Sequence, residues 1–186
     1  MKEENKILKL PNGEFNVPVT TYEKDDIAFF NKIYQQWRDL SNIFKENGGR
    51  NINTPEFFSE GIFCLFNNCY RVTGDINGEK SSFDAYNPKT KKRLQIKACS
   101  IIKDLSSFGP KSVWDECYFL DFYRDGSWDR KIDVYLIPND SIYNCKVNKT
   151  QTLREQQSEK IRPRFSIKEK IINVEKIKPI QTISLV

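Results

Sequence analysis

Hydrophobic and polar positions follow two periods along this chain, and each period predicts a different kind of element. Between Thr20 and Gly49, apolar residues recur at intervals of three or four, which is the spacing of one face of an α-helix. The residues of this face are Ile27, Phe30, Tyr34, Trp37, Leu40 and Phe44. Thr20 and Glu23 form a capping-box pattern at the start, and Gly48 with Gly49 ends the segment. We therefore expect a helix here whose aromatic face packs into the core.

A second helix is predicted to begin at Thr54 as the N-cap residue, with Pro55 in the first helical position. Its apolar positions are Phe57, Phe58, Ile62, Leu65 and Phe66. Glu60 lies within this apolar segment and is followed by Gly61, which costs a helix about 1 kcal/mol relative to alanine. On the pattern alone, Glu60 is most simply an exposed glutamate on the helix surface.

Residues 81–100 alternate with a period of two and predict a β-hairpin. Alternation runs from Phe83 to Tyr86, gives way to the turn residues 87–90, and resumes from Leu94 to Ala98. Because successive side chains of a strand point to opposite faces, Gln95 and Lys97 share one face. The other face, which carries the apolar residues, is expected to pack into the core. If the two strands pair at this turn, Asp84 lies beside Gln95 and Lys97.

The remaining apolar segments predict a sheet around this hairpin. Residues 1–19 indicate a strand or arm with a turn at residues 11–13, and Tyr70 to Thr73 a short strand. Two nearly continuous apolar segments, Cys117 to Tyr123 and Ile132 to Ile137, are typical of strands in the interior of a sheet. This order predicts one α/β or α+β domain with a central mixed β-sheet flanked by helices. We expect its core to span about residues 20–140 of the 186.

Composition narrows the chemistry that such a domain can perform. The chain has no histidine, and its five cysteines contain no Cys-x-x-Cys pair. Ordinary zinc sites, Ser-His-Asp hydrolases, Cys-His proteases and histidine-dependent nuclease motifs are therefore excluded. General acid or base catalysis would depend on carboxylates, lysine or metal-bound water. The cysteines are expected to be reduced and mostly buried. With neither a signal peptide nor a long apolar stretch, we expect a cytoplasmic protein without membrane association.

Positive charge is concentrated near the C-terminus. Residues 146–170 contain eight lysines and arginines but only three glutamates, and the whole chain carries a net charge of +5. Pro163 between Arg162 and Arg164 predicts an extended segment at that point rather than a helix. A solvated, charged surface would produce the same composition, so the excess is compatible with a polyanionic partner without requiring one.

The hairpin also carries a recognisable motif. Asp84, ten intervening residues and the segment Gln95-Ile96-Lys97 resemble the catalytic motif of the PD-(D/E)XK nucleases, the superfamily of many restriction endonucleases. Phe83 stands where that motif often has proline, and Gln95 stands where it usually has aspartate or glutamate. The second departure removes one carboxylate from the site. A hairpin with one polar, solvated face would show the same pattern.

A longer resemblance extends from about Val17 to about Ile172. It is carried by residues 106–122, 134–140 and 161–167, which are similar to small type II restriction endonucleases of the same class, in particular those that cut GCNGC. The resemblance implies Mg²⁺-dependent hydrolysis of phosphodiester bonds in double-stranded DNA, with Mn²⁺ as a substitute metal.

The resemblance also implies roles for the residues of the hairpin. Asp84 would bind the metal directly, and Glu60 directly or through water. The amide oxygen of Gln95 or the backbone carbonyl of Ile96 would complete the protein ligands, which suffices because Mg²⁺ retains several waters. Lys97 would orient the attacking water or stabilise the charge that develops on the phosphate.

Contacts to DNA are expected from the basic region at about residues 141–172 and from two earlier lysines. Arginine is the best bidentate reader of guanine and glutamine of adenine, whereas lysine more often contacts phosphate. Arg162 and Arg164 are therefore the first candidates for reading bases. The full set of candidates is Lys103, Lys111, Arg154, Gln156, Arg162 and Arg164.

A palindromic site implies a homodimer in which each subunit cuts one strand, and a cognate DNA methyltransferase that protects the host genome. Two other classes fit the same residues. A structure-specific or repair nuclease would keep the motif but cleave junctions or damaged DNA. A catalytically inactive DNA-binding module would keep the basic region without cutting.

Overall fold

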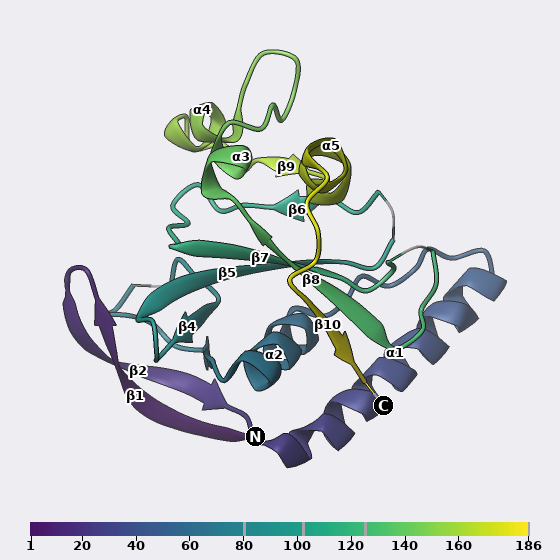
Figure 1. The fold of residues 1–186 in the computed structure, drawn as a ribbon, viewed down its shortest axis with the longest axis horizontal. Coiled ribbons are helices and arrows are strands. Elements are labelled where there is room, and N and C mark those ends of the chain that lie inside the picture. The colour runs from purple at the N-terminus through teal and green to yellow at the C-terminus, as the bar shows by residue number, and fades with distance from the viewer. Residues whose placement is uncertain (80, 102, 125, 186) are drawn as a thin grey trace.

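The computed structural model describes residues 1–79, 81–101, 103–124 and 126–185. Its centre is an eight-stranded mixed sheet in the order β1-β2-β3-β4-β5-β7-β8-β10 (Figure 1). These strands are β1 (Lys2–Leu10), β2 (Gly13–Thr21), β3 (Tyr70–Val72), β4 (Ala85–Asn87), β5 (Lys92–Cys99), β7 (Glu116–Asp121), β8 (Lys131–Ile137) and β10 (Gln181–Ser184). Strands β5 and β7 pair in parallel, and the other neighbours pair antiparallel. The predicted mixed sheet is confirmed.

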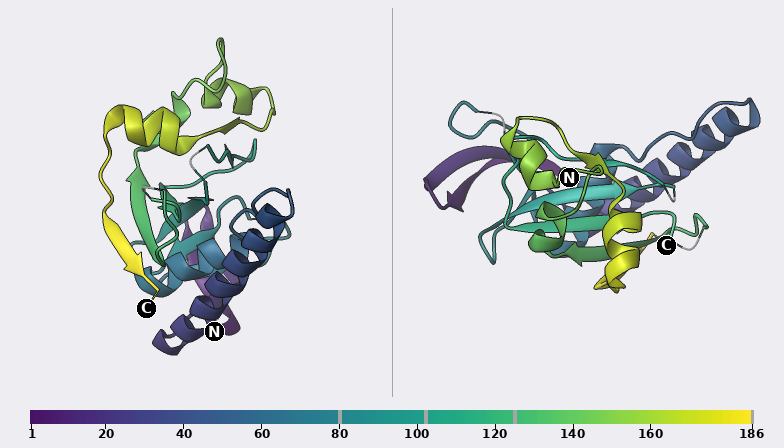
Figure 2. Two further views of the ribbon diagram at one scale, coloured as in Figure 1. Left: turned by 90° about the vertical axis from the view of Figure 1, so that its right-hand side faces the viewer. Right: turned by 90° about the horizontal axis from the view of Figure 1, so that it is seen from above.

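Two layers cover this sheet (Figure 2). The long helix α1 (Ile27–Glu46) and α2 (Glu56–Asn67) pack on one side. The other side carries the short ribbon of β6 (Ser106–Ser107) and β9 (Arg164–Phe165). With it lie α3 (Asn139–Tyr143), α4 (Leu153–Ser158), the π-helical turn η2 (Lys168–Ile172) and α5 (Asn173–Glu175). No helix in the described ranges is long and apolar enough to cross a membrane.

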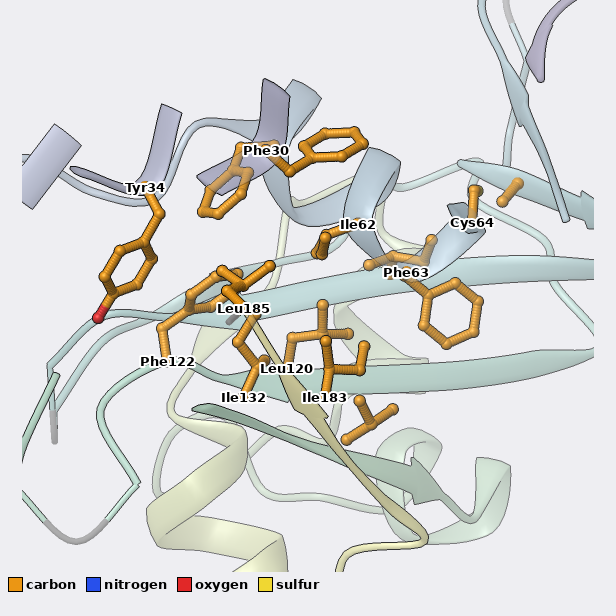
Figure 3. Packing of buried hydrophobic residues seen from close by; sticks show 14 of the residues in the cluster. Phe30, Tyr34, Ile62, Phe63, Cys64, Leu120, Phe122, Ile132, Ile183 and Leu185 are labelled. Carbon is orange, nitrogen blue, oxygen red and sulfur yellow. The ribbon is translucent and has the colours of Figure 1, made fainter. Parts of the chain in front are cut away.

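The main core lies between the two long helices and the sheet. Figure 3 shows Phe30 and Tyr34 of α1 and Ile62 of α2 facing Leu120 of β7 and Ile132 of β8. The opposite face of the sheet buries a second cluster, which includes Cys117 and Phe119 of β7 together with Phe108, Phe165 and Ile171. The apolar segments predicted as interior strands are therefore covered on both faces. All five cysteines are free, and four of them are buried.

The starts of both long helices differ from the prediction. Thr20 belongs to β2, where it pairs with β1, and the capping box is formed by Glu23 and Asp26 around the short 3₁₀ turn η1 (Lys24–Asp26). Pro55, rather than Thr54, is the N-cap residue of α2. The aromatic face of α1 packs as expected up to Trp37, which is 5% exposed.

The last part of the predicted apolar face of α1 is not buried. Leu40 and Phe44 are 47% and 46% exposed, because the C-terminal end of α1 extends past the edge of the sheet (Figure 2). The expectation that the whole apolar face of this helix packs into the core was therefore wrong for these two residues. A helical period indicates which side of a helix is apolar, but the extent of the neighbouring sheet decides how much of it is covered.

Gly61 shows how closely the two long helices approach each other. A Cβ atom at this position would lie 2.7 Å from Cζ of Phe30, so a larger side chain would collide with the ring from α1. The glycine that weakens α2 locally is therefore required by packing. Because Gly61 holds α2 against α1 at this point, the neighbouring Glu60 is placed on a well-fixed part of the helix.

Candidate active site

Asp84 lies immediately before β4, where the hairpin opens. Its backbone N–H donates to the carbonyl of Leu94 at 3.0 Å, which continues the pairing of the two strands by one residue. One carboxylate oxygen, Oδ2, accepts a hydrogen bond from the backbone N–H of Ile96 at 2.7 Å and another from the side-chain amide of Gln95. The ammonium of Lys97 lies 3.9 Å from the same oxygen. The hairpin thus brings together the acid, the amide and the lysine of the predicted motif.

The strand geometry also directs a backbone carbonyl toward Asp84. In a β-strand the N–H and C=O of one residue point to the same side of the strand. Because the N–H of Ile96 points to the carboxylate of Asp84, its carbonyl is directed to that side as well, beyond the end of β4. The side chains of Leu94 and Ile96 are buried in the helical core, so Gln95 and Lys97 occupy the face that the alternation predicts.

Glu60 reaches the site from α2. Its Oε2 accepts a hydrogen bond from Nε of Arg71 on β3 at 2.7 Å, and the glutamate side chain is only 12% exposed. Burial raises the pKa of Glu60 to about 7, and the negative charge of Asp84 adds to this rise, while Arg71 opposes it. Glu60 is therefore a largely buried group beside Asp84 and not the exposed helix glutamate that its pattern allows.

The pKa of Asp84 is raised in the same direction. Burial is the largest cause, and it is opposed chiefly by the positive charge of Lys97 and by the hydrogen bond from the N–H of Ile96. Two carboxyl groups with raised pKa values that repel each other have the electrostatics of a site completed by a cation.

The donor set fits a hard divalent cation. Each carboxylate is anchored through one oxygen, Oδ2 of Asp84 and Oε2 of Glu60, and the other oxygen of each makes no hydrogen bond within the described ranges. No cluster of three or more Asp, Glu, Cys or His side chains able to bind a metal occurs among these residues. The available donors are thus two carboxylate oxygens and a backbone carbonyl, a sparse oxygen set of the kind that Mg²⁺ completes with water.

Gln95 contacts Asp84 through the nitrogen of its amide. Its side chain is buried, and the amide nitrogen, rather than the amide oxygen, faces the carboxylate of Asp84. In this orientation Gln95 fixes one oxygen of Asp84 and leaves the other to a ligand. The metal-binding role expected for its oxygen is not visible in this arrangement.

These groups line a cavity of about 460 Å³ with two walls of different origin. One wall comes from α2 and the hairpin and includes Glu56, Glu60, Asp84 and Lys97. The other comes from residues 104–107, Gly109, Ser112 and Arg162, which lie on or next to the β6–β9 ribbon. In Figure 1 this ribbon lies on the opposite side of the sheet from α2.

The six candidates for DNA contact are not equivalent in the structure. Arg162 and Arg164 are exposed on the predicted extended segment, and Arg162 lines the cavity. Lys103 and Lys111 are exposed in segments that border the cavity, and the guanidinium of Arg154, exposed on α4, lies 5.3 Å from the ring of Tyr143. Gln156, by contrast, is 7% exposed and its amide donates to Gln151 at 3.3 Å. The structure does not present Gln156 to a groove of DNA, because its side chain is buried.

Two residues at this site have no signal in the sequence pattern. Arg71 is one residue of a short strand, and its contact with Glu60 follows only from how β3 lies beside α2. Phe108 looks like an ordinary core aromatic, yet its ring lies 5.6 Å from the ammonium of Lys97. Both contacts join segments far apart along the chain, so no local spacing could have found them.

A mixed sheet flanked by helices, with an acid and a lysine converging at the open end of a central hairpin, defines a restriction-endonuclease-like core. A model of the family described as Bsp6I restriction endonuclease matches residues 22–174. The chain is 34% identical over 157 residues to the type II restriction enzyme Bsp6I of Bacillus sp. (strain RFL6), a match that covers 83% of this chain and 85% of that enzyme. No solved structure matches the chain. The chain belongs to the Bsp6I restriction endonuclease family and is a type II restriction endonuclease.

Proposed function

We propose that this endonuclease uses Mg²⁺ to hydrolyse phosphodiester bonds of double-stranded DNA at GCNGC. The observation that carries the proposal is the convergence of Glu60, Asp84 and Lys97 on one cavity, with oxygen donors on two elements and an ammonium 3.9 Å from the carboxylate of Asp84. The site sequence is supported by the resemblance of residues 106–122, 134–140 and 161–167 to enzymes that cut it.

The free carboxylate oxygens of Asp84 and Glu60 and the carbonyl of Ile96 are the groups that would hold the metal. When bound there, Mg²⁺ would polarise the phosphate and make a coordinated water a better nucleophile. Mn²⁺ has a similar preference for oxygen and is expected to substitute. Gln95 would serve by holding Asp84 in place through its amide, in addition to any contact of its oxygen.

Lys97 is the cation of the site nearest to Asp84. Its ammonium can donate to the attacking water or to a phosphate oxygen, and its charge would stabilise the negative charge that grows on the phosphate. The ring of Phe108 beside the ammonium restricts where it can point. Lys97 would therefore act on the reacting phosphate while Asp84 and Glu60 hold the opposite side.

At the level of the molecule, we propose one nuclease domain over residues 1–186, with a core at about residues 20–140 and a DNA-recognition region at about 141–172. Two copies would act on the two strands of the palindrome. A methyltransferase of the same specificity would protect host DNA in the bacterial cytoplasm.

The test is digestion of a long unmodified duplex with Mg²⁺, Mn²⁺, Ca²⁺ or EDTA, followed by sequencing of the fragment ends. We expect discrete fragments with Mg²⁺ or Mn²⁺ whose ends all map to GCNGC, and protection by cytosine methylation within that site. Ends that map to another motif would remove the proposed specificity and leave a restriction enzyme. Cuts limited to junctions or lesions would instead identify a structure-specific nuclease.

A further inference from the structure

We propose that Arg162 binds the scissile phosphate across the cavity from Asp84, and that Arg164 alone of this pair reads bases. The inference rests on the proposed function and assigns the two arginines, which the sequence treats alike, to different parts of the DNA.

Arg162 and Arg164 differ in their position relative to the cavity. Arg162 lines the same cavity as Glu60, Asp84 and Lys97, whereas Arg164, two residues later, does not. Both side chains are exposed on one side of an extended segment, while Pro163 between them and Phe165 after them are buried. The cavity therefore includes the first arginine of this extended segment and not the second.

A short chain of contacts joins Arg162 and Lys97. The carbonyl of Pro163 accepts a hydrogen bond from the backbone N–H of Phe108 at 3.1 Å. The ring of Phe108 lies 5.6 Å from the ammonium of Lys97 and stacks on the ring of Phe165, with 5.6 Å between the centroids. Phe108 thus ties the backbone next to Arg162 to the catalytic lysine on one side and to the ribbon on the other.

The segment before Arg162 is also held. The backbone N–H of Ile161 donates to the carbonyl of Gln156 at 2.9 Å, and the amide of Gln157 donates to the carbonyl of Gly109 at 2.8 Å. The base of the Arg162 side chain is therefore fixed on both sides by α4 and the β6–β9 ribbon. A fixed backbone restricts the positions that the exposed guanidinium can reach, which lowers the cost of ordering it on a phosphate.

Arg162 also differs from the other charged groups of the cavity in its pairing. Glu60 is paired with Arg71, and Asp84 lies beside Lys97, but Arg162 has no acidic partner within the described ranges. The hydroxyl oxygen of Ser107, which lines the same cavity, is also buried there without a hydrogen-bond partner. A guanidinium and a hydroxyl that line the same cavity as two carboxylates match a phosphodiester, whose two non-bridging oxygens share one negative charge and can accept from opposite walls.

The geometry suits a phosphate better than a base at this position. A base edge is read from within a groove of the duplex, whereas the wall that carries Asp84 and Lys97 must meet the backbone where it is cut. The planar fork of arginine donates two parallel hydrogen bonds to phosphate oxygens, which lysine cannot reproduce. Arg162 would thus hold the phosphate, and Arg164 would lie farther along the DNA.

The test compares Arg162→Ala, Arg162→Lys and the matched control Arg164→Ala, each checked for an unchanged melting temperature. For Arg162→Ala we expect the single-turnover cleavage rate to fall at least about 100-fold, with partial recovery in Arg162→Lys. In Ca²⁺, the affinity of Arg162→Ala should weaken equally for cognate and scrambled duplexes. The dependence of that affinity on salt concentration should become shallower by about one unit for both duplexes. Arg164→Ala should reduce the preference for the cognate duplex by roughly 5- to 150-fold.

A chemical change in the DNA makes the assignment specific. Once the cut position is mapped, one charged oxygen of the scissile phosphate is replaced by a methyl group in a methylphosphonate duplex. We expect the replacement to weaken binding by the wild type and by Arg164→Ala by a larger factor than binding by Arg162→Ala, which keeps only the contacts of Lys97 and the metal with this phosphate. Equal sensitivity of all three proteins, or a loss of base preference in Arg162→Ala as large as in Arg164→Ala, would overturn the assignment. Failure of the wild type to cut with any divalent metal would instead refute the nuclease function on which it rests.

Discussion

Gln95 is the residue at which this site departs most clearly from an acid pair. Its amide donates to Asp84, so an uncharged side chain stabilises the partly buried carboxylate that a second acid would repel. A glutamine in place of an acid lowers the negative charge of the proposed metal site and should therefore stabilise the metal-free folded state. We infer that glutamine at position 95 weakens the binding of the cation but holds Asp84 more firmly in place.

The variant Gln95→Glu tests this role of the amide. In EDTA the variant should lose about 1–3 kcal/mol of unfolding free energy, because it loses the amide bond and gains a like charge beside Asp84. With metal it should still cleave, with a changed ratio of Mg²⁺ to Mn²⁺ activity. Chemical denaturation and a metal titration of the cleavage rate would check both parts. Complete loss of cleavage in a folded variant would contradict this role for Gln95.

At the scale of elements, the hairpin of residues 81–100 could be predicted because its signals are local. Alternation and turn residues determine its pairing, and the pairing places Asp84 beside Gln95 and Lys97. The predictions for residues whose environment depends on distant segments of the chain were wrong. Thr20 resembles a helix cap but is held in β2 by its pairing with β1, and Gln156 resembles a surface residue but is covered by the packing around α4.

The position of Glu60 shows the same limit. Its spacing within α2 does not distinguish an exposed glutamate from a buried one, and only the resemblance made it a candidate for the metal. The structure buries it because α1 packs against Gly61 and because Arg71 of β3 offers a cation to its carboxylate. The second wall of the cavity could not be predicted for a related reason, since it pairs residues 106–107 with residues 164–165.

The contact between α2 and β3 leads to a prediction about pH. Arg71 lowers the pKa of Glu60, so Arg71→Met should raise it further above its value of about 7. Metal binding needs the ionised carboxylate, and cleavage at pH 6.5 should therefore fall about tenfold more than cleavage at pH 8.5. The measurement is the pH profile of the single-turnover rate.

A matched control for this prediction is Arg93→Met, which removes another partly buried pair, the one that Arg93 forms with Asp115 at 2.7 Å. This variant should change stability without moving the profile. An equal loss at both pH values in Arg71→Met would mean that Arg71 serves only the packing of β3.

At the scale of the whole molecule, the raised pKa of Glu60 links stability to pH. The carboxyl has an ordinary pKa of 4.5 and a folded pKa of about 7, so between these values the folded state binds more protons than the unfolded state. The free energy of unfolding therefore falls as pH rises through this window. Asp84, whose pKa is also raised, contributes in the same direction.

We expect the melting temperature in EDTA to decline between pH 5 and pH 7.5, and to decline less in Glu60→Gln, which has no carboxyl to ionise. Adding Mg²⁺ at pH 7.5 should restore much of the loss in the wild type, because the cation binds the ionised folded state. Differential scanning calorimetry over this range gives the comparison. Identical slopes for the wild type and Glu60→Gln would show that Glu60 is not the buried carboxyl responsible.

Recognition of a palindrome predicts a second property of the whole molecule. Two copies should bind one duplex and leave equivalent ends on both strands. Analytical ultracentrifugation with and without a GCNGC duplex, together with end mapping on each labelled strand, tests this directly. A monomer that nicks only one strand of the site would contradict the proposed symmetry.

The central claim is that Glu60, Asp84 and Lys97 form one catalytic metal site, and Asp84 is its most constrained member. The most direct measurement is cleavage of a GCNGC duplex in Mg²⁺ by Asp84→Ala, beside Asp75→Ala, which removes an exposed aspartate from the loop ahead of the hairpin. We expect Asp84→Ala to lose all detectable cleavage, to bind the duplex in EDTA within about threefold of the wild type because phosphate contacts elsewhere dominate affinity, and to remain folded. Asp75→Ala should cut normally. Retained cutting by Asp84→Ala would contradict the site assigned here.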